Sequence, residues 1–149
     1  MDKDALEGVL QELPQIFPLM EGKILRVGLK AVEREKGIAP HHLMILKLVR
    51  EAGPLPLSEI GGWHDIPKPQ MTYLIDRLED LGLVERRADT KDRRVINVAL
   101  TSKGKKTLEE CMELIKYSAG ERLSSLGEDD LRQLAAALKW VREIISKVE

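Results

Sequence analysis

The sequence predicts a mainly α-helical fold with one small β-hairpin. Over most of the 149 residues, apolar side chains recur every three or four positions, which is the period of an amphipathic helix. The stretch 83–100 differs, because two short apolar runs flank a charged loop there. Aromatic residues make up 3% of the chain, so the core has to rest on aliphatic side chains, which suit helices. The length suffices for one domain with a substantial core.

The first helical segment is expected over residues 4–36. Its apolar face is formed by Leu6, Val9, Leu10 and Leu13. Pro14 and Pro18 predict a kink or a break, because proline lacks the amide hydrogen that a helix interior uses. Gly37 is the expected C-terminal cap.

A second helix is predicted between Pro40 and Gly53. It is apolar almost all round and is therefore expected to be buried. A short extended piece follows. A brief helix with Ser58 as its N-cap then reaches about Trp63.

The segment "PKPQMTYLIDRLEDLG" predicts the next helix. Pro69 suits its first turn and Gly82 stops it. Its apolar stripe consists of Met71, Leu74, Ile75, Leu78 and Leu81. "LVERR" and "RVINVAL" then predict two strands around the charged loop 88–94.

The last third of the chain is predicted to be helical again. Thr101 or Ser102 can cap a long amphipathic helix that runs to about Leu123. Gly127 precedes the final helix, whose first turn is acidic, as the helix dipole prefers. Its apolar stripe consists of Leu131, Leu134, Leu138, Val141, Ile144 and Ile145. Acidic surroundings make this stripe a core or dimer interface rather than a membrane-binding face.

Charge is unevenly distributed, although the formal net charge is −1. Residues 63–106 carry ten basic and seven acidic side chains, and both flanking regions are net acidic. A basic middle favours a polyanionic partner. The acidic N-terminus is unlike a signal peptide, no run approaches the roughly 18 apolar residues of a membrane span, and one cysteine excludes an internal disulfide. A cytoplasmic protein without membrane contact is the expectation.

The order of the predicted elements is that of a winged helix-turn-helix. Its amphipathic second helix fits the DNA major groove, and an arginine at the hairpin tip is attracted by the negative potential of the minor groove. The stretch "MTYLIDRLEDLGLVERRADTKDRRVINVALTSKGKK" resembles the MarR family of bacterial and archaeal transcription regulators. The resemblance rests on the helix pattern T-x-x-[IV]-D-R-L-E, the turn L-G-L-V-x-R, the wing D-x-x-D-R-R and the exit L-T-x-x-G.

This resemblance implies a homodimer that binds double-stranded DNA at pseudo-palindromic operators, most simply as a repressor. Residues 1–36 and 102–149 would be the dimerisation helices, and residues 37–101 the DNA-binding region of one continuous domain. Many family members release DNA when a small phenolic or other aromatic ligand binds. We expect no cofactor and no enzymatic activity, because the sequence has no nucleophile–base pair, no phosphate-binding glycine loop and no metal-ligand cluster.

The family's functional positions fall on the recognition helix and the wing. Arg94 would enter the minor groove, Asp92 would hold it by a charge-assisted hydrogen bond, and Asp89 would order the loop. Arg93 would touch phosphate or solvent. The major-groove residues would be Lys68, Gln70, Thr72 and Tyr73, and the phosphate contacts Ser58, Arg77 and Lys103. The ligand pocket would be lined by His42, Leu46, Trp63 and Met71.

Simpler interpretations remain for several of these residues. Asp92 and Arg94 could form only a surface ion pair. Arg77 could pair with an aspartate of its own helix, and Tyr73 could pack on the surface. The prolines of "IPKPQ" depart from the family pattern, which leaves the base-contacting residues at the helix start open. The whole chain could also be a winged-helix module for protein–protein contact.

The histidines and the cysteine are expected to have ordinary roles. His41 and His42 are adjacent, so their side chains diverge on a helix and cannot easily share a metal ion. His64 has no cysteine or histidine at zinc-binding spacing. Cys111 is expected to be a buried structural thiol rather than a redox sensor, because its acidic neighbours disfavour a thiolate.

Overall fold

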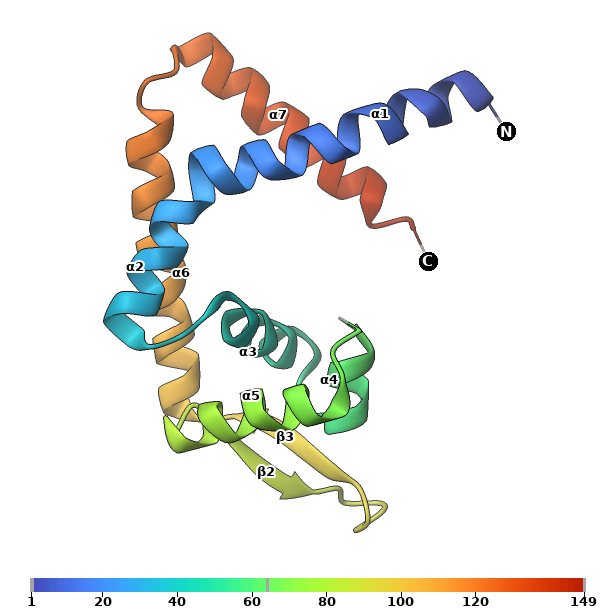
Figure 1. The fold of residues 1–149 in the computed structure, drawn as a ribbon, viewed down its shortest axis with the longest axis vertical. Helices are drawn as coiled ribbons and strands as arrows, with labels where there is room; N and C mark the ends of the chain where they lie inside the picture. Colours follow the sequence, from blue (N-terminus) through green and yellow to red (C-terminus); the bar gives the residue numbers. More distant parts are fainter. Residues whose placement is uncertain (1, 64, 149) are drawn as a thin grey trace. The chain divides into compact units, whose positions relative to one another are not determined.

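The computed structural model describes residues 2–63 and 65–148, which form two compact units (Figure 1). One unit comprises Met1–Val27 and Lys116–Glu149, and the other comprises Gly28–Ile115. Helices α2, Arg26–Lys36, and α6, Ser102–Leu123, each contribute residues to both units. The assignment of dimerisation helices to residues 1–36 and 102–149 stays a prediction.

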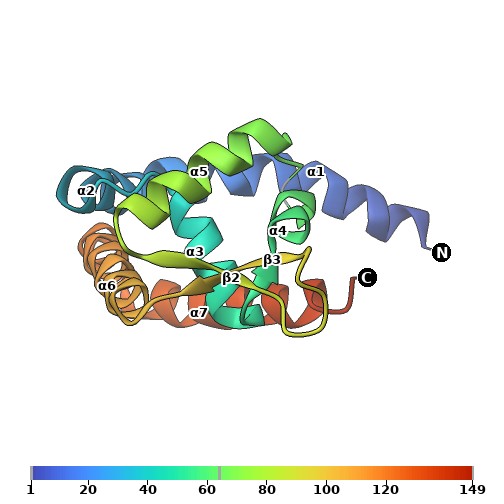
Figure 2. The same ribbon diagram turned by 90° about the horizontal axis from the view of Figure 1, so that it is seen from below.

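The unit Gly28–Ile115 contains the predicted winged helix-turn-helix. Its complete elements are α3 (Pro40–Ala52), β1 (Leu55–Pro56), α4 (Leu57–Trp63), α5 (Lys68–Asp80), β2 (Val84–Ala88) and β3 (Ile96–Leu100). The three strands form an antiparallel sheet in the order β1-β3-β2, and α5 lies along the hairpin of β2 and β3 (Figures 1 and 2). The mainly helical fold with a small wing is therefore confirmed.

Aliphatic side chains hold this unit together. Ile45 and Leu46 of α3, Ile75 of α5, Val98 of β3 and Leu108 of α6 are completely buried. The predicted stripe of α5 faces this core, and α3 is buried on several sides, as its composition predicts. Because α5 is fixed through its apolar stripe, its polar face has to point outward.

The sheet contains one strand more than the hairpin predicted from the sequence. The extended piece Leu55–Pro56 pairs with β3, so that Leu55 lies opposite Val98 and Pro56 opposite Asn97. β2 pairs with β3 from Val84↔Leu100 to Ala88↔Ile96. Proline is tolerated in β1 because β1 is an edge strand. The wing is thus anchored to the segment that precedes α4.

Of the kink or break expected at Pro14 and Pro18, the break is wrong. Helix α1, Lys3–Leu19, runs through both prolines, and the irregularity follows as a π-helical stretch η1, Met20–Leu25. Each proline removes one amide donor and crowds the carbonyl four residues earlier, which a helix can absorb locally. A widened π turn after Pro18 is one such adjustment.

The N-cap expected at Ser58 is also wrong. Helix α4 begins at Leu57, so Ser58 lies inside its first turn. The Leu57 side chain packs against the hydrophobic core, and this packing favours a helix start two residues earlier than an N-cap at Ser58 predicts. Ser58 remains exposed and available to a partner.

The apolar faces predicted for the two ends of the chain are exposed in the unit Met1–Val27 and Lys116–Glu149. In α1, Val9 and Leu10 are 55% and 58% exposed, and in α7, Glu128–Ile145, Val141 and Ile144 are 50% and 55% exposed. All residues of the described hydrophobic core lie in the other unit. Within the described residues, no helix is both long enough and apolar enough to cross a membrane.

The turn from α5 into the sheet is fastened to the start of α6. Gly82 adopts φ +73°, a conformation that glycine tolerates best. The Thr101 hydroxyl donates to the Gly82 carbonyl at 2.6 Å and accepts from the Gly104 amide at 2.9 Å, so Thr101 caps α6 as predicted. A Cβ added at Gly104 would lie 1.9 Å from the Leu83 carbonyl oxygen. The close approach of backbone to backbone therefore requires glycine at this position.

We expect Gly104→Ala to lower the free energy of unfolding by about 1–3 kcal/mol, because the added methyl group overpacks against rigid backbone. Urea unfolding followed by circular dichroism measures the change. Gly120→Ala is the matched control, since Gly120 lies in the same helix with nothing within 4 Å of an added Cβ. Alanine there should stabilise by up to about 1 kcal/mol. Equal effects of the two substitutions would contradict the close approach.

Candidate nucleic-acid interface

The outward face of α5 carries the residues predicted for the major groove. Lys68, Gln70 and Tyr73 are exposed, and Tyr73 retains 69% of its accessible surface. Tyr73 therefore does not pack on the protein surface. The Thr72 hydroxyl donates to the Lys68 carbonyl at 3.0 Å, so Thr72 is engaged by its own helix. Of the five α5 positions chosen from the sequence, Lys68, Gln70, Tyr73 and Arg77 are thus exposed, and Thr72 is partly buried.

The start of α5 is unusual because Pro67 occupies the N-cap position and makes no side-chain capping hydrogen bond. Pro69 lies in the first turn, as predicted. Two prolines remove two amide donors, so this helix start offers an anion fewer backbone donors than usual. The Lys68 side chain is the positive group that remains there.

An ion-pair network that the sequence interpretation missed joins the wing to α5. Arg86 of β2 donates from Nη2 to Asp76 Oδ1 at 2.5 Å and from Nη1 to Glu79 Oε1 at 2.9 Å. The hydrogen bond to Asp76 is the largest cause that raises the pKa of Arg86 above its ordinary value. Asp76 and Glu79 lie three residues apart, on one helical face, and this spacing was the available signal. Arg86 thereby fixes β2 against α5.

Arg77 forms neither of the pairs considered from the sequence. Asp76 is bonded to Arg86, and no ion pair joins Arg77 to Asp80 in the described part of the chain. The Arg77 guanidinium lies near Gly37, where an added Cβ would be 3.4 Å from Nη2. Its contact with phosphate stays a prediction.

The loop between β2 and β3 is ordered by the Asp89 carboxylate. Asp89 Oδ2 accepts from the amides of Lys91 at 2.9 Å and Asp92 at 3.0 Å, and Asp89 Oδ1 accepts from Asn97 Nδ2 at 3.0 Å. These bonds, led by the amide of Asp92, lower the pKa of Asp89 below its ordinary value. The loop is therefore a hydrogen-bonded structure rather than a loose hairpin tip.

Arg94 leaves this loop with its guanidinium held by Asp92. Asp92 Oδ1 accepts from the Arg94 amide at 3.0 Å and from Arg94 Nε at 3.1 Å, while Asp92 Oδ2 accepts from Arg94 Nη2 at 3.2 Å. The bond from the Arg94 side chain is the main cause of a lowered pKa at Asp92. The Arg94 side chain is 91% exposed, so it is oriented and yet free to meet a partner. Arg93 is exposed beside it.

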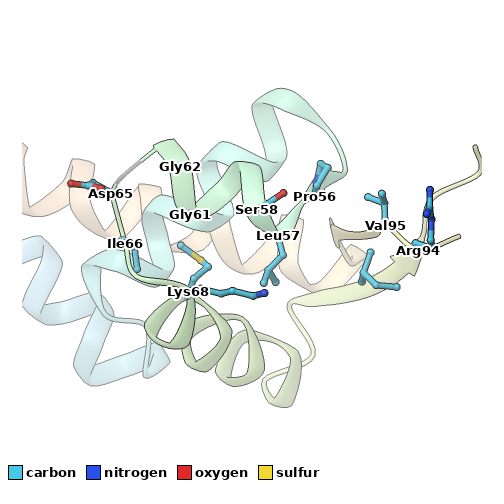
Figure 3. A pocket seen from close by; sticks show the side chains of 12 residues that line it. Pro56, Leu57, Ser58, Gly61, Gly62, Asp65, Ile66, Lys68, Arg94 and Val95 are labelled. Atoms are coloured by element: carbon cyan, nitrogen blue, oxygen red, sulfur yellow. The ribbon is translucent and has the colours of Figure 1, made fainter. Parts of the chain in front are cut away.

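A cavity of about 620 Å³ lies between α4, the start of α5 and the wing at residues 94–96 (Figure 3). Ser58, Lys68 and Arg94 line it from these three elements, with the apolar side chains of Met71 and Val95 among the other lining residues. The structure thus brings one predicted phosphate contact, one predicted major-groove residue and the predicted minor-groove residue around a single cavity.

The ligand pocket predicted at His42, Leu46, Trp63 and Met71 stays a prediction. Leu46 is completely buried in the core, and Met71 is 1% exposed, on the floor of the cavity just described. His42 is 8% exposed, and its Nδ1 accepts from the Ala39 amide at 3.2 Å. The side chain of Trp63 lies outside the described residues.

His42 is an ordinary helix-start residue, as expected. Because Nδ1 accepts a hydrogen bond, Nε2 carries the proton of the neutral ring, and burial lowers the pKa of His42. No group of three or more possible metal ligands occurs in residues 2–63 and 65–148. His64 lies outside the described residues.

Lys103 and Cys111 belong to the start and middle of α6. Lys103 Nζ donates to the Leu81 carbonyl at 2.9 Å and so caps the C-terminal end of α5. An ammonium group has two further donors, so its phosphate contact stays a prediction. Cys111 is completely buried, and burial raises the pKa of its thiol, which fits a structural role. Glu110 beside it is bonded to Lys36 of α2.

Comparison with known proteins gives concordant matches. A family model described as the MarR family matches residues 38–96. The HTH-type transcriptional repressor MdtR of Bacillus subtilis (strain 168) is 35% identical over 113 residues, which cover 76% of this chain and 72% of MdtR. The HTH-type transcriptional regulator MhqR of the same organism is 30% identical over 105 residues, 70% of this chain and 72% of MhqR.

Solved structures agree with these sequence matches. The apo form of wild-type MarR from E. coli is similar with a TM-score of 0.76 and 25% identity, over 87% of this chain and 95% of that one. The transcriptional regulator BldR from Sulfolobus solfataricus is similar with a TM-score of 0.73 and 25% identity, over 99% and 100% of the two chains.

We expect Arg86→Ala to lower the free energy of unfolding by about 1 kcal/mol at low salt, and by less at high salt. The substitution leaves Asp76 and Glu79 without their counter-charge in the C-terminal half of a helix, where the helix dipole disfavours acids. Urea unfolding at two salt concentrations measures it. Arg87→Ala is the matched control, because Arg87 on the same strand is bonded only to its neighbour Glu85 among the described residues. A control that destabilises equally would contradict the role of Arg86.

Proposed function

The chain belongs to the MarR family, and from that premise we propose that it is a dimeric repressor that reads a pseudo-palindromic operator with α5 and the wing. Members of this family are DNA-binding transcription regulators rather than enzymes. Four points of this proposal go beyond membership of the family: the dimer, the sense of regulation, the effector and the contacts of single residues. Such a regulator works on the chromosome, which places its activity in the cytoplasm.

The arrangement of Arg94 is the observation that carries the proposal. A guanidinium that is 91% exposed is oriented by the Asp92 carboxylate through two side-chain bonds at 3.1 and 3.2 Å. A plain surface ion pair would not require the Arg94 amide to bind the same carboxylate as well. An oriented arginine at the tip of a wing is suited to the narrow, negative minor groove.

The exposed face of α5 supports a major-groove contact. Gln70 can pair bidentately with adenine, Lys68 can bond guanine, and Tyr73 can contact bases or the sugar–phosphate backbone. Ser58, Arg77 and Lys103 are proposed phosphate contacts, which position the protein without reading sequence, and Arg93 is proposed to contact phosphate. Thr72 is proposed to contact the major groove as well, because it is partly exposed, although its hydroxyl is bonded within the helix.

The dimer is supported by apolar surface that a single chain leaves in water. Phe17 in α1 and Trp140 in α7 are 73% and 66% exposed, and further aliphatic residues of both helices are about half exposed. Large apolar side chains exposed in this number on two helices favour a surface that another molecule covers. A second copy of the chain is the proposed occupant, and its two-fold symmetry would match paired half-sites on DNA.

Repression and effector control rest on similarity. MdtR carries the word repressor in its name, and we propose the same sense of regulation here. Release of DNA by a small phenolic or other aromatic effector is implied by the family resemblance alone. The alternative of a protein–protein interaction module has no observation in its favour.

We expect Arg94→Ala to weaken operator binding by roughly tenfold or more while the dimer persists, because a direct contact to the groove is lost. Fluorescence anisotropy with the operator, obtained by selection from random DNA, measures affinity over a salt series. The logarithmic salt slope should fall by about one unit. Arg132→Ala, which removes an exposed arginine paired with Glu128 in α7, is the control and should bind normally. Unchanged binding by Arg94→Ala would refute the minor-groove assignment.

We expect Ile144→Asp, alone or with Phe17→Asp, to shift the protein from dimer to monomer, because a carboxylate cannot be buried cheaply in an apolar interface. Light scattering coupled to gel filtration measures the mass. Specific operator binding should fall together with the dimer. Lys139→Ala is the control on the polar side of α7, where Lys139 pairs with Glu143. A dimer that survives both aspartate substitutions would exclude these helices from the interface.

A further inference from the structure

Asn97 is the one side chain of β3 that bonds to the wing loop in the described structure. It lies opposite Arg87 of β2 and Pro56 of β1, so pairs on both sides hold its backbone. Asn97 belongs to none of the motifs on which the family resemblance rests. Its amide donates from Nδ2 to Asp89 Oδ1 at 3.0 Å. Because a carboxylate only accepts hydrogen bonds, the amide nitrogen has to face Asp89.

We propose that Asn97 is a positioning residue for Arg94, which it orients through Asp89 and Asp92; the inference rests on the proposed DNA contact of Arg94. Successive hydrogen bonds join Asn97 on β3 to Asp89, Asp89 to Asp92, and Asp92 to the Arg94 guanidinium. Asn97 itself touches no DNA in this proposal.

The first step fixes the Asp89 carboxylate. Asp89 Oδ2 accepts from two backbone amides, those of Lys91 and Asp92, at 2.9 and 3.0 Å. Only one orientation of the carboxylate aims that oxygen at both amides. The bond from Asn97 to Oδ1 holds this orientation from the strand side. Without it, rotation of the carboxylate competes with the bonds that shape the loop.

The second step passes from Asp92 to Arg94. The Asp92 amide is held by Asp89, and the Asp92 carbonyl accepts from the Val95 amide at 3.0 Å. The backbone of Asp92 is therefore fixed on both sides. Its carboxylate then meets the Arg94 amide and guanidinium at 3.0 to 3.2 Å. If Asp92 were displaced, the Arg94 guanidinium, which is almost fully exposed, would lose the hydrogen bonds that orient it.

Strand stability does not explain an asparagine at this position. Asparagine is depleted in β-strands, where β-branched residues are preferred. Asn97 Oδ1 is also buried without a hydrogen-bond partner among the described residues, which costs free energy. The hydrogen bond from Asn97 to Asp89 offsets both the low strand propensity of asparagine and the unpaired Oδ1. A residue selected for folding alone would be apolar and β-branched here.

The first experiment is a double-mutant cycle on operator affinity. Asn97→Val removes the amide and favours the strand, so the fold should survive, which thermal unfolding checks. We expect roughly fivefold to tenfold weaker binding in the wild-type background and no further loss in Arg94→Ala. Ile96→Val, at the neighbouring exposed strand position, is the control and should bind normally. Normal binding by Asn97→Val, or the same loss in both backgrounds, would overturn the proposal.

A charge exchange tests the hydrogen bond itself. Asn97→Asp places two carboxylates face to face, so operator binding should weaken near neutral pH. Its deficit relative to the wild type should shrink as the pH falls, because repulsion raises the pKa at which one of the pair takes up a proton. Asp89→Asn combined with Asn97→Asp restores one donor and one acceptor and should bind within about twofold of the wild type. Failure of the double variant to recover would overturn the role of the Asp89–Asn97 pair.

Amide hydrogen exchange separates this inference from the function on which it rests. The Lys91 and Asp92 amides should lose protection in Asn97→Val without any DNA present, whereas Ile96→Val should leave them unchanged. Unchanged protection in Asn97→Val overturns the inference even if the protein binds DNA. Failure of the wild type to bind selected DNA would instead refute the proposed function.

Discussion

The burial of one helical stripe determines where the polar contacts of α5 can lie. Met71, Leu74, Ile75 and Leu78 fix α5 in the core of its unit, at exposures of 6% or less. The rotation of α5 about its axis is then no longer free, so Lys68, Gln70 and Tyr73 have to point outward. The hairpin packs against the same helix, and Arg86 bonds its first strand to the polar face. Core packing and surface chemistry are therefore two consequences of a single helix orientation.

The acids of this region orient its arginines rather than cancel them. Asp92 holds Arg94, and Asp76 with Glu79 holds Arg86, so each pair fixes a guanidinium that would otherwise sample many rotamers. A nearly neutral chain can consequently present a directed positive charge. An arginine that is already held in one orientation loses less conformational entropy when a partner binds. This effect does not require a large net charge on the protein. The formal charge of the whole protein says little about such a surface.

The elements of the fold were largely predictable from the sequence, because aliphatic periodicity, Gly82 and Pro69 report directly on packing and turns. The errors arose where tertiary contacts overrode local signals. Burial of Leu57 moved the start of α4, and α1 absorbed Pro14 and Pro18 instead of breaking. At the candidate interface, the roles of Asp89, Asp92 and Arg94 were implied by the resemblance to the MarR family. The contacts of Arg86 and Asn97 were not predicted because their partners lie on other elements: the packing of β2 on α5 brings Arg86 to Asp76, and the pairing of the strands brings Asn97 to Asp89.

The hydrogen bonds of the wing are made by carboxylates that hold their negative charge firmly. Hydrogen bonding lowers the pKa of both Asp89 and Asp92, so their contribution to loop order is complete above the usual aspartate range and is lost only as the pH falls through the lowered values. The chain has no histidine between residues 84 and 100, and arginine keeps its proton. Acidification toward the usual aspartate range thus leaves Asp89 and Asp92 ionised, and the hydrogen bonds that these two carboxylates accept in the tip persist.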